Sequence, residues 1–337
     1  MDARGFLDRL SASAGADASL AHVRTLPARA PQTVPADELP PTLRERLSLL
    51  GIEGLYPHQR RGLDLLEAGR NVAIATGTAS GKTLVYNLAF ALAALEDEKR
   101  TALYVFPTKA LARDQLRQVR SLRLPQIRAA VYDGDTPKPE RPLVRRNANL
   151  VMTNPDMLHA SILPGHERWA DFLLRLGLVV VDEAHAARGV FGSHVAMVLR
   201  RLRRLAAHYG GNPQFVTASA TVGNPTELAE RLTGLPFEEV SEDASPRGEK
   251  LFVLWNPPMV DEELGVRRGA VSETAWLLKE LVESETRTIA FCRSRLAKSR
   301  SSARSRRWLQ KTSPPARRRF SSAAAPTGTM CRRQSII

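Results

Sequence analysis

Eight consecutive residues, Thr76-Gly77-Thr78-Ala79-Ser80-Gly81-Lys82-Thr83, have the composition of a loop that holds phosphate groups. This phosphate loop follows the apolar run 72–75 and precedes a helical pattern. Its glycines can therefore turn backbone amides toward a phosphate at a helix N-terminus, while Lys82 reaches the β and γ phosphates and Thr83 places its hydroxyl on Mg²⁺. Thr76 stands where the pattern G-x-x-x-x-G-K-[ST] has its first glycine, but the flanking strand and helix favour phosphate binding over a structural loop.

Two adjacent acids, Asp182 and Glu183, follow three valines at 179–181. Adjacent acids usually belong to a solvated loop, but carboxylates directly after a buried strand are costly unless a cation pairs with them. At the carboxyl edge of a parallel sheet, Asp182 could hold Mg²⁺ through water, and Glu183 could orient and deprotonate an attacking water. Together with the phosphate loop, these acids predict Mg·ATP hydrolysis.

A parallel α/β sheet must position these segments. From Leu43 onward, short apolar runs alternate with longer amphipathic segments, which is typical of βαβ units. Several runs are almost continuously apolar, as in strands that are covered on both faces. The predicted strands are 71–75, 101–106, 128–132, 150–153, 178–181 and 214–219, and the predicted helices are 83–95, 110–122 and 192–208.

The pattern divides the chain into a lead-in, a first compact domain, a second α/β unit and a tail. We expect the Ala- and Pro-rich lead-in to be loosely ordered, with one short helix near 6–10, because closely spaced prolines exclude a long helix. The second unit is predicted to have strands at 251–255 and 288–292 around a helix at 271–283. The four parts are 1–42, 43–245, 246–295 and 296–337.

Composition limits the class of protein. The 337 residues carry a formal net charge of +14, but the last 52 hold 14 Lys and Arg and no acid, so the first 285 are neutral. Apolar residues make up 43%, which excludes disorder throughout. No apolar run approaches the roughly 20 residues that cross a bilayer, so we predict a soluble, cytoplasmic protein without membrane contact. Two cysteines, Cys292 and Cys331, are too few for a disulfide framework or a four-ligand zinc site.

The phosphate loop and the acidic pair resemble motifs of the superfamily 2 DEAD/DEAH-box ATP-dependent helicases. Residues 76–83 and Asp182-Glu183-Ala184-His185 resemble the family's motifs I and II. Further matches occur in the family's order: Tyr56-Pro57-His58-Gln59, Phe106-Pro107-Thr108-Lys109, Asp133-Gly134-Asp135-Thr136, Thr153-Asn154-Pro155, Ser219-Ala220-Thr221 and Ile289-Ala290-Phe291-Cys292-Arg293-Ser294. The residues of several motifs resemble those of the DNA-helicase branch whose members end in a cysteine-cluster domain.

The resemblance implies a RecA-like domain followed by a second one, of which residues 246–295 are expected to be only the incomplete start, and it implies a role for each motif. The cofactors would be ATP and Mg²⁺, and the partner would be nucleic acid, most simply DNA. The implied catalytic residues are Lys82, Asp182, Glu183 and His185. ATP would be held by Tyr56, Gln59 (which would contact adenine) and residues 76–83, and Mg²⁺ by Thr83 and Asp182. Ser219, Ala220 and Thr221 would couple hydrolysis to strand movement, and the nucleic acid would be held by Pro107, Thr108, Lys109, Gly134, Asp135, Thr153, Asn154, Pro155 and Arg293.

Basic helix faces give a weaker signal. Arg113, Arg117 and Arg120 lie at helical spacing and are read either as a solvated face or as a nucleic-acid contact. A second arginine group is expected to form a helix face or a partner surface: Arg200, Arg201, Arg203 and Arg204.

The family's arginine-finger motif is not found after Cys292. We therefore expect weak ATP and DNA binding, slow hydrolysis and impaired unwinding; the alternative is an ATP- and nucleic-acid-binding remnant without unwinding. From about Leu296 the sequence is basic and has no apolar periodicity, which indicates a disordered tail that is either out of frame or an evolved nucleic-acid-binding segment. A third alternative, an unrelated P-loop ATPase or kinase, does not require Ser219-Ala220-Thr221.

Overall fold

The computed structural model describes residues 3–12 and 20–291 of the chain. The chain divides into two compact units. One, which we call the sheet unit, is Ala30–Pro246, and the other, the terminal unit, consists of Met1–Arg29 and Arg247–Ile337. The phosphate loop and both acids of the candidate site lie in the sheet unit.

The sheet unit is built on seven parallel strands in the order β10-β4-β9-β8-β5-β7-β6. Every neighbouring pair is parallel, so all the strands end at one edge of the sheet. The strands are β4 Val72–Ala75, β5 Thr101–Val105, β6 Ala129–Val131, β7 Leu150–Thr153, β8 Leu176–Val181, β9 Gln214–Ser219 and β10 Glu238–Val240. A separate antiparallel pair joins β2 (Val34–Pro35) to β3 (Gly54–Leu55).

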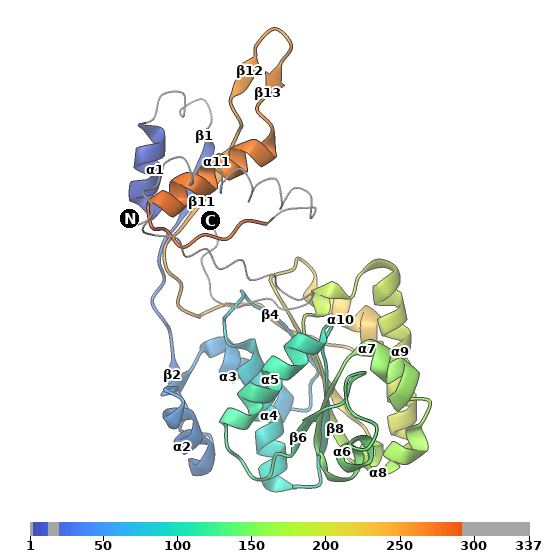
Figure 1. Cartoon of the computed structure of the whole chain (residues 1–337). Helices are drawn as coiled ribbons and strands as arrows, with labels where there is room; N and C mark the ends of the chain where they lie inside the picture. The colour runs from blue at the N-terminus through green and yellow to red at the C-terminus, as the bar shows by residue number, and fades with distance from the viewer. Residues whose placement is uncertain (1–2, 13–19, 292–337) are drawn as a thin grey trace. The chain divides into compact units, whose positions relative to one another are not determined.

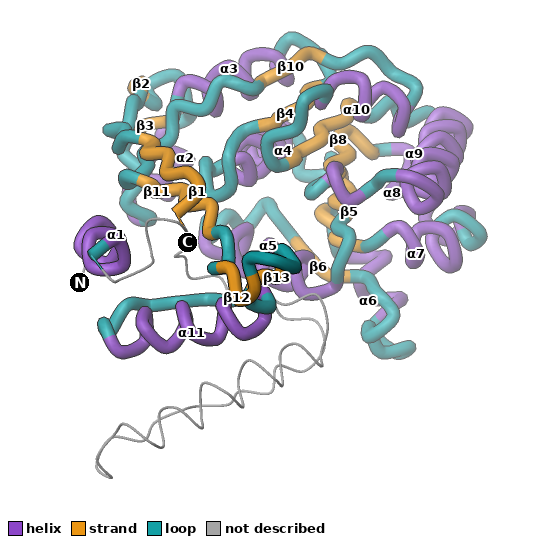
Figure 2. Tube along the Cα trace, turned by 90° about the horizontal axis from the view of Figure 1, so that it is seen from above, coloured by secondary structure: helices purple, strands orange, loops and turns teal. Residues whose placement is uncertain are grey.

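Helices connect these strands and cover both faces of the sheet (Figures 1 and 2). They are α2 Pro41–Leu49, α3 Pro57–Glu67, α4 Lys82–Glu96, α5 Lys109–Ser121, α6 Arg141–Asn147, α7 Pro155–Met157, α8 Ala170–Leu174, α9 Gly189–Tyr209 and α10 Pro225–Thr233.

Alternate residues of the inner strands β4, β5, β7 and β8 belong to two separate apolar cores. Val180 of β8 packs in the core of α3, α4 and α5, while its neighbours Val179 and Val181 pack in the core of α8, α9 and α10. This alternation is expected because successive side chains of a strand point to opposite faces. Both faces are therefore buried, which is the reason that the strands contain few polar residues.

The parallel α/β fold predicted from the sequence is confirmed. The six predicted strands and the three predicted helices of this unit are present, with bounds that differ by at most three residues. The seventh strand, β10, was not predicted. It lies at the edge of the sheet, and its residues Glu238 and Glu239 are exposed, so it has no apolar run to mark it.

The terminal unit contains an antiparallel pair formed by segments that are far apart in the sequence. Strand β1 (Leu20–Leu26) pairs with β11 (Lys250–Trp255), and a small core contains Phe6, Leu10 and Leu281. Its other elements are α1 Ala3–Ser11, β12 Met259–Asp261, β13 Val266–Arg267 and α11 Ala270–Glu283.

Two expectations for this unit are wrong. The lead-in contains a seven-residue strand, β1, in place of a loosely ordered segment, because β11 supplies the hydrogen bonds that a sequence pattern cannot reveal. The predicted strand 288–292 is not formed at 288–291, and residue 292 lies outside the described residues. The tail 296–337 also lies outside them, so its predicted disorder, and the second RecA-like domain itself, stay predictions.

Across residues 3–12 and 20–291, no helix combines the length and the apolar character that a membrane span requires. The predicted cytoplasmic location stays a prediction.

Candidate functional site

Most of the predicted site residues lie at the edge of the sheet where the parallel strands end. The phosphate loop follows β4, Ser219 ends β9, and Asp182 follows β8, and these three strands are neighbours in the sheet. The loops with Pro107, Gly134 and Asn154 follow the next three strands, β5, β6 and β7. Strand order alone therefore places the predicted nucleotide residues along one half of the edge and the predicted nucleic-acid residues along the other half.

The phosphate loop has the geometry of an anion-binding turn. Gly81 precedes α4 with φ +80°, and Ala79 also has a positive φ, +61°. The buried hydroxyls of Thr76 and Ser80 are hydrogen-bonded at 2.6 Å across the loop. Lys82 Nζ donates to the carbonyl oxygens of Thr76 (2.9 Å) and Gly77 (2.6 Å). The ammonium group thus lies inside the loop, where the phosphates of a nucleotide would bind.

Gln59 holds the phosphate loop from the side of α3. Its side-chain amide donates to the carbonyl oxygen of Gly81 (3.0 Å) and accepts from the backbone N–H of Tyr56 (2.8 Å). A Cβ atom on residue 81 would lie 2.4 Å from Gln59 Nε2, so this contact requires glycine there. His58 adds a second buried contact, from Nε2 to the carbonyl oxygen of Ser80 (3.0 Å). The contact of Gln59 with adenine stays a prediction.

Asp182 is a buried carboxylate, with 8% of the residue exposed. The Tyr86 hydroxyl donates to its Oδ2 (3.1 Å), and the backbone N–H of Glu183 donates to its Oδ1 (2.9 Å). Burial, and next the charge of Glu183, raise the pKa of Asp182 to about 6, although both hydrogen bonds and the charge of Lys82 oppose the rise. A carboxyl group whose charge is this costly is suited to a site that receives a cation.

His185 connects the acids to the end of β9. Its Nδ1 lies 3.3 Å from Glu183 Oε2 and 3.5 Å from the backbone nitrogen of Ala220. A protonated Nδ1 can donate to Glu183, whereas an unprotonated Nδ1 can accept from Ala220, so one nitrogen cannot serve both partners at once. The structure thus brings Glu183, His185 and the segment Ser219-Ala220-Thr221 together; their coupling role stays a prediction.

The predicted nucleic-acid loops after β5 and β6 are joined by ion pairs. Lys109 Nζ lies 2.6 Å from Asp135 Oδ1, and Arg113 Nη2 lies 2.7 Å from Asp135 Oδ2. The hydrogen bond from Lys109 is the main reason that the pKa of Asp135 is lowered from its usual value. Asp135 therefore neutralises part of the positive charge of this surface, and nucleic-acid binding by the loops that contain Lys109, Gly134 and Asp135 stays a prediction.

The loop after β7 is held by its own side chains. The buried Thr153 hydroxyl donates to the carbonyl oxygen of Tyr132 (2.7 Å), and Asn154 Oδ1 accepts from the backbone N–H of Met157 (2.8 Å) as the cap of α7. Pro107 and Pro155 line a small hollow beside Glu183 and Phe191. Thr108 caps α5 in the same manner as Asn154 caps α7. Nucleic-acid binding by these residues stays a prediction, and Arg293 lies outside the described residues.

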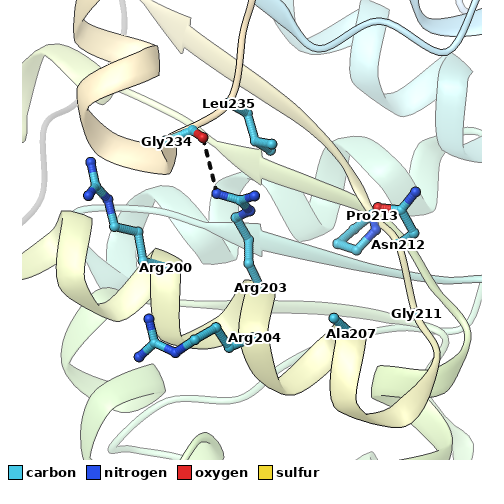
Figure 3. A pocket seen from close by; sticks show the side chains of 9 residues that line it. All are labelled: Arg200, Arg203, Arg204, Ala207, Gly211, Asn212, Pro213, Gly234 and Leu235. Carbon is cyan, nitrogen blue, oxygen red and sulfur yellow. Dashed lines mark hydrogen bonds between the residues drawn. The ribbon is translucent and has the colours of Figure 1, made fainter.

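A larger cavity, of about 380 Å³, lies away from this edge and is lined by arginines of α9 (Figure 3). Arg203 Nη1 donates to the carbonyl oxygens of Thr233 (2.6 Å) and Gly234 (3.3 Å), and Arg200 Nη2 donates to that of Arg231 (3.0 Å). These carbonyls are at the C-terminal end of α10, where an α-helix leaves acceptors unpaired. The arginines thus cap α10, which favours the helix-face reading of this group.

Two important residues of the site were missed by sequence reasoning. Tyr86, the partner of Asp182, lies in the apolar run of α4, where a buried tyrosine hydroxyl signals only that some partner must exist. Asp243 accepts a hydrogen bond from the backbone N–H of Gly77 (3.1 Å), although it lies 166 residues further along the chain. No motif contains Asp243, so only the fold could reveal it. In the described part of the chain, no three or more His, Cys, Asp or Glu side chains form a group that could hold a metal ion.

Comparison with known proteins gives a family match over the residues of this site. The sequence model described as DEAD/DEAH box helicase matches residues 56–228. The chain is 44% identical over 273 residues to YprA of Bacillus subtilis, described as an uncharacterized ATP-dependent helicase, and the match covers 79% of this chain and 36% of YprA. It is also 44% identical over 248 residues to the ATP-dependent helicase HRQ1 of Saccharomyces cerevisiae, with 71% of this chain and 23% of HRQ1 covered.

A solved structure is similar over most of the chain. The crystal structure of the DUF1998 helicase MrfA bound to DNA and AMPPNP matches with a TM-score of 0.85 and 38% sequence identity, over 92% of this chain and 43% of MrfA. In each of these three comparisons, the chain spans less than half of the relative's own length.

Proposed function

The chain belongs to the DEAD/DEAH box helicase family of ATP-dependent enzymes, within which it is similar to YprA, HRQ1 and MrfA, and we propose that it hydrolyses Mg·ATP and couples hydrolysis to movement along DNA. The observation that supports ATP hydrolysis most directly is the arrangement of Lys82 and Asp182 at the ends of β4 and β8. Lys82 lies close enough to the buried Asp182 for its positive charge to lower the pKa of that carboxyl group, which burial raises.

The residues of this site fit a nucleotide with its metal ion. Lys82 would exchange its two loop carbonyls for the β and γ phosphates, and the amides of the loop would hold the remaining phosphate oxygens. Thr83 and Asp182 would hold Mg²⁺, and the unfavourable burial of the Asp182 charge is the feature that such an ion would relieve. Mg²⁺ would supply neutralisation of the charge on the phosphates.

Glu183 is the residue best placed to act as the base. It follows Asp182 in a left-handed backbone conformation, with φ +52°, which turns its side chain toward His185. In the proposed mechanism the Glu183 carboxylate orients a water molecule and takes its proton. His185 lies between Glu183 and the backbone nitrogen of Ala220, so the change in charge on Glu183 would act through His185 on the segment 219–221.

DNA is the proposed nucleic acid because MrfA, at 38% identity, was solved with DNA. The exposed Thr108 loop follows β5, the neighbour of β8, and the exposed Gly134 loop follows β6 further along the same edge of the sheet. Short hydroxyls and backbone amides in such loops can follow a phosphate chain without reading bases. A second candidate is an ATP- and DNA-binding protein without unwinding activity. It relies on the same ATP residues, Lys82 and Asp182, and differs from the first candidate only in lacking strand separation.

The test is ATP turnover by the full chain and by Glu183→Gln, each with and without single-stranded DNA. We expect DNA to stimulate the wild type and Glu183→Gln to fall about 10²-fold or more, toward background. Equal rates in all four reactions would refute hydrolysis at this site. Stimulated turnover without strand separation of a partial duplex would favour the second candidate.

A further inference from the structure

The segment that follows β10 returns to the phosphate loop. Asp243 Oδ2 accepts a hydrogen bond from the backbone N–H of Gly77 at 3.1 Å. A Cβ atom on residue 77 would lie 2.7 Å from the same carboxylate oxygen, so the approach depends on glycine at that position. The contact is therefore a close one between an acid and a backbone amide of a loop that is built to bind anions.

The Asp243 carboxylate is fixed from its other side. Oδ1 accepts hydrogen bonds from the backbone N–H of Ser245 (2.9 Å) and from the Ser245 hydroxyl (2.6 Å). The backbone N–H of the intervening Ala244 donates to His58 Nδ1 (3.4 Å), and His58 in turn contacts the carbonyl oxygen of Ser80. The segment 243–245 is thus attached at two points to residues that shape the phosphate loop.

We propose that Asp243 is an internal competitor of the nucleotide phosphates, an inference that rests on the proposed function. Its carboxylate occupies one amide of the loop, and its negative charge opposes the approach of another anion to the neighbouring amides. Lys82 meanwhile donates to the carbonyl oxygens of Thr76 and Gly77. Nucleotide binding therefore exchanges both sets of contacts, and Asp243 leaves Gly77 as the phosphates enter.

The position of Asp243 in the chain gives this exchange a second consequence. The sheet unit ends at Pro246 and the terminal unit resumes at Arg247, four residues after Asp243. Release of the carboxylate removes one of the two attachments of the segment 243–245, while the bond of Ala244 to His58 stays, so occupancy of the nucleotide site loosens the segment that leads to the connection between the units. A nucleotide with phosphates at the loop triggers this release, whereas adenosine does not.

The first measurement is the affinity of the full chain for a fluorescent Mg·ATP analogue and for the matching adenosine analogue. Asp243→Asn keeps the shape of the side chain and removes its charge, so we expect about three- to tenfold tighter binding of the ATP analogue and unchanged binding of the adenosine analogue. Ser245→Ala removes the 2.6 Å hydrogen bond to Oδ1 and should tighten binding in the same direction by less. Glu242→Gln is the matched control, because it removes the same charge from the exposed adjacent residue and should stay within about twofold of the wild type.

The second measurement is cleavage by trypsin after the exposed Arg247, with and without the ATP analogue. We expect the nucleotide to accelerate cleavage of the wild type, and Asp243→Asn to be cleaved rapidly even without it. The competitor proposal alone is overturned if Lys82→Ala abolishes binding of the ATP analogue but Asp243→Asn leaves its affinity unchanged or makes it weaker. Absence of saturable ATP binding in the wild type overturns the proposed function instead.

Discussion

Replacing Asp182 by asparagine should stabilise the metal-free, nucleotide-free chain. Burial raises the pKa of Asp182 from its ordinary value of 3.8 to about 6, a difference of roughly two units. At about 1.4 kcal/mol per unit, the ionised carboxylate lowers the free energy of unfolding by about 3 kcal/mol. Asparagine removes that charge but keeps only one acceptor oxygen for the Tyr86 hydroxyl and the Glu183 N–H. We therefore expect a net gain of about 2 kcal/mol at pH 8.

The sign of the pH dependence distinguishes this cause from simple repacking. Since the folded pKa of Asp182 is the higher one, the penalty is fully present above about pH 6 and disappears as the pH falls toward the unfolded pKa. Between pH 8 and pH 5 the ionisation penalty should fall by about half, so the net advantage of Asp182→Asn should shrink from about 2 kcal/mol to below about 1 kcal/mol. Glu183→Gln removes the second cause of the raised pKa and should show a smaller gain with the same pH trend.

The assay is denaturant unfolding of the full chain in EDTA at pH 8, 6 and 5, with thermal unfolding as a second measurement. For a unit of this size, about 2 kcal/mol corresponds to a rise in the unfolding temperature of about 4–8 °C. A loss of stability for Asp182→Asn at pH 8, or a gain that does not change with pH, would refute the reasoning. In buffer without EDTA, added Mg·ATP should stabilise the wild type more than the variant, which lacks one of the two residues proposed to hold Mg²⁺.

Other contacts give two further predictions. Asp135→Asn should release Lys109 and Arg113 from their ion pairs with Asp135. We expect single-stranded DNA to bind about three- to tenfold more tightly at low salt, and its affinity to depend more steeply on salt concentration. Fluorescence anisotropy can measure both, and unchanged binding would show that this surface does not contact DNA. Arg203→Ala should lower the free energy of unfolding by about 1–3 kcal/mol, because the carbonyl oxygens at the end of α10 lose their donor. The control Arg204→Ala removes an exposed arginine of the same helix and should change the free energy of unfolding by less than about 0.5 kcal/mol. Equal effects of the two substitutions in denaturant unfolding would contradict the capping role.

Most of the sheet could be predicted because its strands are buried on both faces. The valines at 179–181 and the run at 72–75 are apolar throughout, and such runs need no knowledge of their neighbours to be recognised. Strands that depend on a distant partner could not be predicted. The mostly exposed strand β1 is ordered by β11, more than 200 residues away, and the acidic edge strand β10 is ordered by β4.

The same difference separates the parts of the site. Lys82, Asp182 and Glu183 are recognisable because their chemistry depends on local spacing next to a strand or a helix. Asp243 and Tyr86 act through a contact with a segment at least 96 residues away, and nothing near them in the sequence indicates that contact. Nucleic-acid contact by the Asp135 loop stays a prediction from its motif, and the ion pair of Asp135 with Lys109 is a contact between two loops that no local pattern indicates.

The site combines several local choices that oppose stability. Asp182 is charged in a buried position, and Ala79 and Glu183 both have a left-handed backbone, which costs a residue with a Cβ atom roughly 1–2 kcal/mol. None of these choices is needed to form the sheet, whose two apolar cores lie on either side of it. Each is needed if a phosphate and a cation are to meet at the ends of β4 and β8. The cores on both faces of the sheet therefore stabilise the fold enough to tolerate these unfavourable residues, and ligand binding at this edge should raise the free energy of unfolding.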